Sequence, residues 1–327
     1  MIDHNPVIEC RTVPCVLCGS RDFSRVASGQ DYEYKTSHQT FYFVSCLSCG
    51  HVYLNPRPTP ASLPKAYPDH YYTLEGRHTV RHSMIIPRLK SLVIKHRLRE
   101  FKNLFKTKAK ILEVGCGDGS LLLDLKHRYP GLDLTGMDFS VSQDTDRLFH
   151  EAGIKLIRGR VEDTALEPES YDLIIMNQVI EHVPDPPSVL ASLAKSLKPG
   201  GRISIETPNR VGYDRRFFKD SFWGGYYFPR HLHLFDKTGL TALLEKNGFV
   251  VEYHAYLLAP IIWAFSFHGL FSHAPWAGGC LKRLAGFFSD RNPLCLSIFT
   301  LVDILARLCG LATSNQKFIA RKESLVD

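Results

Sequence analysis

The stretch "ILEVGCGDGS" at 111–120 joins an apolar run to three alternating glycines, Gly115, Gly117 and Gly119. Glycines at such a position let the backbone approach a ligand closely and lead directly into a helix. The preceding acid, Glu113, would repel a pyrophosphate but could meet the amino group of an amino-acid ligand. The pattern E-x-G-x-G-x-G departs from the dinucleotide fingerprint G-x-G-x-x-G. We predict that Glu113 and the three glycines bind a cofactor.

Four more polar residues follow at or just after later apolar runs: Asp138, Glu162, Asp163 and Asn177. Asp138 ends "LDLTGMD", where a carboxylate can accept hydrogen bonds from ribose hydroxyls. Asp163 in "GRVEDTAL" could accept one from an adenine amine, and we assign its neighbour Glu162 and Asn177 to the same site. Ligands of parallel α/β sheets lie beyond the carboxyl ends of the strands. These residues alone fit either a dinucleotide or S-adenosylmethionine.

Apolar runs that alternate with amphipathic stretches must position these residues. We predict strands over 109–115, 132–138, 154–159, 171–177 and 202–208, and helices over 120–129 and 187–201. The nearly continuous apolar run at 171–177 is typical of a strand buried on both faces. Strands alternating with helices predict an α/β fold with a parallel, doubly wound, Rossmann-like sheet.

Four of the nine cysteines form two C-x-x-C-G knuckles: Cys15 and Cys18 in "CVLCGS", and Cys46 and Cys49 in "CLSCGH". Together they supply four thiolates, which suits a closed tetrahedral zinc site with no open position for catalysis. Disulfides or free thiols are the alternatives, and disulfides are disfavoured in the cytoplasm. We therefore predict a structural zinc in a module over 1–60. A turn-rich linker and a basic helix over 61–109 follow it.

Several motifs together point to a family. In order, "ILEVGCGDG", Asp138, "VED", "DLIIMNQVIEHV" and "LKPGGRI" resemble the motifs of class I S-adenosylmethionine-dependent methyltransferases. The knuckles and "CGHVYLNPRP" are similar to the branch with an N-terminal zinc ribbon, which includes deoxysugar C-methyltransferases. The resemblance implies a seven-stranded sheet with the cofactor-binding core over 110–256. It also implies a final hairpin interrupted by a helical insertion over 257–313, with the last strand and tail over 314–327.

His182 and His231 are the candidate catalytic residues. His182 lies in "VIEHV" after the fourth predicted strand, and His231 in "YYFPRHLHLFD" after the fifth. An imidazole with its usual pKa can accept a proton from an acceptor hydroxyl or acidic carbon. Both match histidines of the deoxysugar C-methyltransferases, but Phe228 and Arg230 replace that family's Tyr and acid. Arg230 could instead clamp a substrate phosphate or carboxylate, and His182 could position rather than catalyse.

The resemblance implies methyl transfer to a sugar, a sugar nucleotide or a lipid-linked glycan, with His-assisted deprotonation. A methyltransferase acting on a non-sugar small molecule or lipid is one alternative. A nicotinamide (NAD)-dependent oxidoreductase is another, which Glu113 argues against. A third is a non-enzymatic zinc-ribbon binding module on a methyltransferase-like scaffold. The intact glycines and Asp138 argue against loss of cofactor binding, though not against loss of catalysis. The sequence identifies neither the acceptor nor the oligomeric state.

Charge and hydrophobicity are unevenly distributed along the chain. Residues 81–110 hold ten Lys or Arg against one acid, Glu100, while residues 257–313 carry few charges. A solvated helix face and a lid or dimer contact explain these features; attraction to an anionic membrane is the alternative. No basic, aromatic-rich motif indicates nucleic acid. Because "MIDHNPVIEC" does not resemble a signal peptide, we expect a cytoplasmic protein, with peripheral association at the inner face of the membrane left open.

Overall fold

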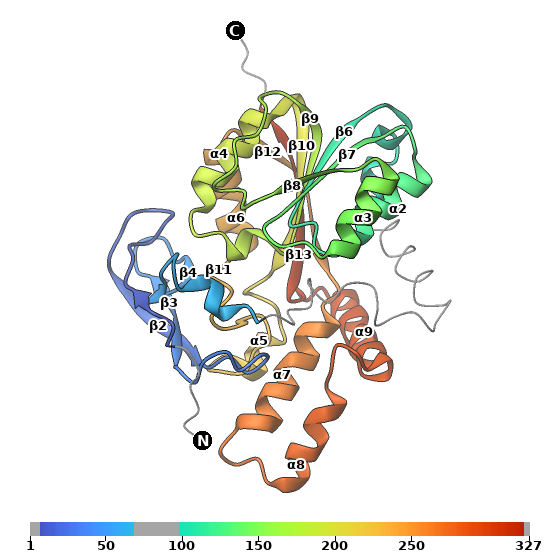
Figure 1. The fold of residues 1–327 in the computed structure, drawn as a ribbon. Coiled ribbons are helices and arrows are strands. Elements are labelled where there is room, and N and C mark those ends of the chain that lie inside the picture. The colour runs from blue at the N-terminus through green and yellow to red at the C-terminus, as the bar shows by residue number, and fades with distance from the viewer. Residues whose placement is uncertain (1–6, 69–97, 324–327) are drawn as a thin grey trace.

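The computed structural model describes residues 7–68 and 98–323. Its centre is a seven-stranded sheet in the order β12-β13-β10-β9-β6-β7-β8 (Figure 1). The strands are β6 (Lys110–Val114), β7 (Asp133–Asp138), β8 (Lys155–Arg158), β9 (Tyr171–Asn177), β10 (Leu197–Pro208), β12 (Phe249–Leu257) and β13 (Asn315–Lys322). β6 to β10 are parallel to one another, and β13 runs antiparallel to both of its neighbours. The predicted Rossmann-like sheet, with its final hairpin, is confirmed.

Helices cover both faces of this sheet, as Figure 1 shows. One face carries α2 (Ser120–Arg128) and α3 (Gln143–Ala152), and the other carries α4 (Pro186–Ser196) and α6 (Lys237–Lys246). Successive strand side chains point to opposite faces, so Leu173 and Ile175 pack with α2 and α3, while Ile174 and Met176 pack with α4 and α6. This explains why 171–177 is apolar throughout.

One helix boundary differs from the sequence prediction, and one helix was missed. α4 ends at Ser196 rather than at residue 201, because Pro199 has no amide proton to continue the helix and Gly200 takes a positive φ of 73°. The polar helix α3 was not predicted. Its start is recognisable at Ser142, whose side chain accepts a hydrogen bond from the Thr145 amide.

The N-terminal part forms a smaller sheet beside the first. β2 (Phe23–Gly29), β3 (Phe41–Cys46) and β4 (Val52–Leu54) pair in sequence, as the predicted hairpin requires, and β1 (Cys10–Arg11) pairs with β5 (Arg57–Pro58). The fourth strand of this sheet, β11 (His233–Leu234), comes from the chain after β10. The predicted module over 1–60 therefore shares a sheet with the methyltransferase half.

The predicted basic helix falls largely on residues 69–97, which lie outside the described residues. Where the description resumes, the chain forms two short 3-10 turns, Arg99–Phe101 and Leu104–Lys106, rather than one continuous helix. Leu98, Phe101 and Phe105 are buried against the face of the sheet that carries α2 and α3. This packing explains their near-helical spacing.

The apolar segment after β12 is helical, as predicted. It contains α7 (Pro260–His273), α8 (Gly279–Leu284) and α9 (Pro293–Leu308), which extend beyond the sheet next to the short helix α5 (Arg215–Phe218) (Figure 1). Across residues 7–68 and 98–323, no helix has the length and apolar character needed to cross a membrane.

Candidate active site

The glycine loop is tied to the end of β7 by hydrogen bonds. The Gly117 amide donates to Oδ2 of Asp138 at 2.9 Å, and the Gly115 amide donates to the Met137 carbonyl at 2.7 Å. Gly115 has a φ of +72°, and a Cβ there would lie 2.4 Å from a methyl group of Val179. Asp138 is buried, and burial raises the pKa of its carboxyl. The loop thus requires glycine where it meets the neighbouring strand end.

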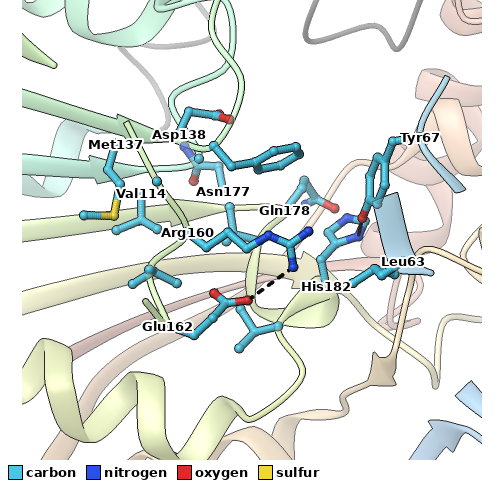
Figure 2. A pocket seen from close by; sticks show the side chains of 16 residues that line it. Leu63, Tyr67, Val114, Met137, Asp138, Arg160, Glu162, Asn177, Gln178 and His182 are labelled. Carbon is cyan, nitrogen blue, oxygen red and sulfur yellow. Dashed lines mark hydrogen bonds and ion pairs between the residues drawn. The ribbon is translucent and has the colours of Figure 1, made fainter. Parts of the chain in front are cut away.

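A pocket opens beyond the carboxyl ends of β6, β7 and β9, and Figure 2 shows its lining. Of the predicted cofactor residues, Gly115, Asp138, Glu162 and Asn177 line it. Glu113 is buried, Asp163 is exposed, and these two, with Gly117 and Gly119, lie outside the lining. Gly117 still acts on the pocket because it holds Asp138.

Sequence reasoning did not single out several of the lining residues. They include Leu63, Tyr67, Phe139, Arg160, Gln178 and Val179. Nη1 of Arg160 lies 4.0 Å from Oε1 of Glu162, the contact dashed in Figure 2, and its guanidinium lies 5.6 Å from the Phe139 ring centre. Arg160 belongs to the stretch "GRVEDTAL", so it could have been predicted as a cofactor-pocket residue together with its neighbours Glu162 and Asp163. Tyr67 was not recognisable because it comes from the segment before the core.

A second pocket adjoins the first, and His182 and Gln178 line both. Its apolar wall comes mainly from the insertion: Leu258, Ala259, Pro260, Ile261, Ile262 and Phe265. Tyr227, His231, Asp290 and Asn315 add polar groups. Gln178 Nε2 donates to Asn315 Oδ1 at 3.1 Å. A group bound in the second pocket would therefore meet the first pocket at His182 and Gln178.

Two lining residues have a strained backbone. Gln178 has a φ of +55° and Tyr227 a φ of +44°, and both are non-glycine residues. Such conformations cost about 1–3 kcal/mol and persist where the surroundings impose them, often at functional sites. The backbone amide of Gln178 donates a hydrogen bond to the backbone carbonyl of Glu206 at 2.8 Å, which holds Gln178 in this conformation. The strain therefore coincides with the walls of the second pocket.

The hydrogen bonds of the two histidines define their tautomers. Nδ1 of His182 lies 3.0 Å from the Arg230 carbonyl, and Nδ1 of His231 lies 2.8 Å from the Gly225 carbonyl. A carbonyl oxygen only accepts, so each Nδ1 carries the proton and each Nε2 keeps its lone pair. Burial lowers the pKa of His182 to about 4 and that of His231 well below its usual value. Both rings are therefore neutral acceptors at pH 7.

Glu181 is fully buried next to His231. Its Oε2 accepts a hydrogen bond from Thr207 Oγ1 at 2.9 Å, and its Oε1 lies 3.9 Å from His231 Nε2. Burial raises the pKa of this carboxyl to about 8, so it is largely protonated at neutral pH. The ligand atoms of Glu181, His182 and His231 lie within 4.8 Å of one another, a composition that could also hold a divalent cation.

Arg230 and His233 are engaged within the protein. Nη1 and Nη2 of Arg230 bind the two carboxylate oxygens of Asp31 at 3.0 and 2.6 Å, and both side chains are fully buried. His233 Nδ1 lies 2.9 Å from His51 Nε2 in the N-terminal sheet. The idea that Arg230 clamps a substrate anion is therefore wrong for this conformation, because its guanidinium joins the loop before β11 to the segment after β2.

The four knuckle cysteines converge, and their sulfurs all lie within 4.8 Å of one another. Cys15 Sγ is 3.6 Å from Cys49 Sγ, and Cys18 Sγ is 3.5 Å from Cys46 Sγ. A disulfide requires a separation of about 2.05 Å, whereas four sulfurs about 2.3 Å from one tetrahedral zinc lie about 3.8 Å apart. The donor set and its spacing fit zinc.

Comparison with known proteins assigns the chain to a family. A family model described as a methyltransferase domain matches residues 87–254, just over half of the chain. The chain belongs to the methyltransferase domain family. It is an S-adenosylmethionine-dependent methyltransferase, and the oxidoreductase alternative is set aside.

Curated relatives of this methyltransferase include ubiquinone biosynthesis O-methyltransferases. That of Photobacterium profundum is 41% identical over 106 residues, 31% of this chain and 44% of that protein. That of Aliivibrio fischeri is 35% identical over 145 residues, 43% of this chain and 58% of that protein. The chain spans about half the length of the curated relatives it matches.

Solved structures of similar fold include a methyltransferase from Archaeoglobus fulgidus, at a TM-score of 0.44 and 20% identity over 71% of this chain and 94% of that chain. Geranyl diphosphate C-methyltransferase from Streptomyces coelicolor has a TM-score of 0.48 and 14% identity over 72% and 77% of the two chains.

Proposed function

We propose that this methyltransferase methylates a hydroxyl group of a small, largely apolar acceptor that binds in the second pocket. The observation that carries the proposal is that the cofactor pocket and the second pocket share two lining residues. His182 and Gln178 line the cofactor pocket and also the second pocket, whose apolar wall consists mainly of residues 258–262 and Phe265. Apolar walls with a few polar groups are typical of sites for hydrophobic small molecules.

The first pocket fits S-adenosylmethionine, and different lining residues would contact different parts of the cofactor. Asp138 accepts hydrogen bonds from the ribose hydroxyls, and Glu162 and Asn177 supply further polar contacts beside apolar walls from Val114, Met137 and Val161. Glu113, Gly117 and Gly119 shape the loop, and Asp163 remains a proposed adenine contact. When bound, the cofactor supplies an activated methyl group on a sulfonium, so the protein mainly has to align the acceptor.

His231 is the proposed general base. Its Nδ1 proton is fixed on Gly225, so Nε2 can accept the hydroxyl proton of the acceptor. The imidazolium formed in this way would face Oε1 of Glu181, which lies 3.9 Å from Nε2 and has no hydrogen-bond partner among the described residues. His182, whose ring centre is 4.7 Å away, orients the acceptor at the pocket junction.

Further proposals concern the cysteine cluster, the N-terminal module, the class of acceptor and the location of the protein. We propose a structural zinc on Cys15, Cys18, Cys46 and Cys49, and a ribbon-like module over 1–60 that supports the pocket through Asp31. A sugar, sugar nucleotide or lipid-linked glycan acceptor, as the deoxysugar C-methyltransferase resemblance implies, is the competing proposal. The named relatives act in ubiquinone biosynthesis, which agrees better with a non-sugar acceptor. A cytoplasmic location remains proposed.

An acceptor panel tests the proposal. Transfer of a radiolabelled methyl group would be measured with phenols and catechols bearing apolar chains and with sugar nucleotides, each with and without a chelator. Ile261 lines the second pocket, and we expect Ile261→Glu to raise KM for the apolar acceptor while leaving affinity for S-adenosylmethionine unchanged. Val250→Glu, at an exposed position on β12, is the matched control. Transfer to sugar nucleotides alone, or an unaltered KM in Ile261→Glu, would refute this acceptor site.

A further inference from the structure

Helix α9 presents an apolar stripe to solvent. Leu294, Ile298, Leu301, Leu305 and Leu308 recur at intervals of four and three residues, with exposed fractions from 44% at Ile298 to 79% at Leu308. The buried face holds Cys295, Phe299 and Ala306 together with Asp303. A helix with an apolar stripe on its outer side, in addition to apolar residues on its buried side, is normally covered there by protein or lipid. The exposed stripe therefore marks a binding surface.

The outward orientation of the stripe is fixed by Asp303 on the buried face of α9. Its carboxylate accepts hydrogen bonds from the Ala259 amide at 2.6 Å and from Trp263 Nε1 at 2.9 Å. Rotation of α9 to bury the leucines would break both bonds and leave a buried acid without them. The helix cannot cover its own stripe.

We propose that α9 docks on an anionic lipid surface with this stripe immersed at the interface. All of α9 lies within the described residues, and its exposed face carries no acidic side chain, because Asp303 is its only acid and is buried. The exposed charges of the insertion are Lys282, Arg283, Arg291 and Arg307 against a single acid, Asp290. An apolar helix face flanked by basic residues is the pattern of interfacial helices.

The dimensions of α9 fit a surface position. Its 16 residues span about 24 Å, which is short of the roughly 20 residues needed to cross a bilayer. Pairing with a second copy of the chain is less favourable. The stripe covers only about two heptads, fewer than the three or four typical of a coiled coil. Pairing would also bring the positive charges of Arg291 and Arg307, near the two ends of α9, close to those of the second copy, whereas anionic lipid would neutralise these charges.

Docking would bring the acceptor pocket close to the lipid. α7, which packs on α9, supplies Pro260, Ile261, Ile262 and Phe265 to the wall of the second pocket. An apolar acceptor dissolved in the membrane would then be available beside its binding site. This consequence rests on the proposed acceptor pocket, whereas the docking itself rests only on α9.

Vesicle flotation of the whole chain tests the docking. Vesicles of phosphatidylglycerol and phosphatidylcholine would be compared with pure phosphatidylcholine, each at low and high salt. We expect binding to the anionic vesicles that weakens with salt, and a loss of roughly a hundredfold in Leu301→Gln/Leu305→Gln, because burial of each of the two leucine side chains contributes about tenfold. Arg307→Glu should weaken binding to anionic vesicles. Val250→Gln, an exposed apolar position on the central sheet, should bind as wild type does.

Two results would overturn the docking. One is failure of the wild type to bind anionic vesicles at low salt. The other is equal binding by wild type and by Leu301→Gln/Leu305→Gln, with circular dichroism and calorimetric S-adenosylmethionine affinity showing that the variant is folded. Light scattering that shows a dimer dissociated by the same variant, without vesicle binding, would assign the stripe to a second copy. A wrong acceptor assignment would change none of these readouts.

Discussion

The rings of His182 and His231 lie with their centres 4.7 Å apart in an edge-to-face arrangement. His182 comes from the turn after β9, and His231 from the loop after β10 that leads into the N-terminal sheet. Each ring uses Nδ1 on a carbonyl oxygen and leaves Nε2 as an acceptor. Two neutral bases thus stand where the cofactor pocket meets the second pocket.

We predict that both rings stay neutral well below pH 6.5. In nitrogen-15 histidine NMR spectra, His182 and His231 should show the Nδ1–H tautomer at pH 5.5, assigned with His182→Gln and His231→Gln. A histidine whose folded pKa is below its unfolded value contributes stability above about pH 6.5. That contribution is lost as the pH falls toward the folded pKa, about 4 for His182. Titration of either ring near pH 6.5 would contradict the tautomer assignment.

Asp138 should be essential for cofactor affinity. Asp138→Ala removes the acceptor proposed for the ribose hydroxyls and the partner of the Gly117 amide. Hydrogen bonds to charged groups contribute about 1.5–3 kcal/mol each, so the dissociation constant for S-adenosylmethionine should rise by at least tenfold in calorimetric titration. Asp144→Ala, on the outer side of α3, is the control. An unchanged constant would remove Asp138 from the cofactor site.

The cysteine cluster should contain one zinc per chain, measured by elemental analysis of purified protein. Cys18→Ser and Cys49→Ser remove single ligands and should release the metal and lower the melting temperature, because a structural zinc contributes directly to folding. Cys280→Ser and Cys309→Ser alter exposed cysteines of the insertion and should retain it. Metal-free protein in which all four knuckle cysteines are freely alkylated would refute the site.

The Asp31–Arg230 pair should be a major link between the N-terminal module and the loop before β11. Removal of one partner from a buried ion pair typically costs about 3–5 kcal/mol, because the remaining charge is left uncompensated. Asp31→Asn should lower the free energy of unfolding in urea by an amount in this range. Asp22→Asn changes an exposed aspartate of the same module and should have little effect. Equal stability of the two variants would show that the pair is dispensable.

Local patterns in the sequence were enough to predict the central sheet. The glycine loop, the runs ending at Asp138 and Asn177, and the final antiparallel strand all lie where periodicity and family resemblance put them. The pairing of β11 with β4 could not be predicted, since two residues carry no periodicity and their partners are far away in sequence. The ion pair of Arg230 with Asp31 could not be predicted either, because tertiary packing brings these two distant residues together. Burial also lowered the pKa of the histidines, a shift that sequence alone does not reveal.

His231 should matter for turnover more than for cofactor binding. It lines the second pocket, and the first pocket does not include it. A positioned base contributes about 10²–10⁴-fold in rate, so His231→Ala should lower single-turnover methyl transfer by a factor in that range. Calorimetric affinity for S-adenosylmethionine should stay close to that of wild type. His182→Ala should alter both quantities because His182 lines both pockets.

The comparison uses the acceptor identified by the panel and includes His150→Ala, an exposed histidine on α3, as the matched control. A base that acts through Nε2 should be partly replaced by added imidazole in His231→Ala, because the cavity left by the ring adjoins the acceptor. A purely structural role would give a variant that imidazole does not rescue. Wild-type turnover in His231→Ala would move the base elsewhere, and the Glu181 carboxyl beside it would be the next residue to test.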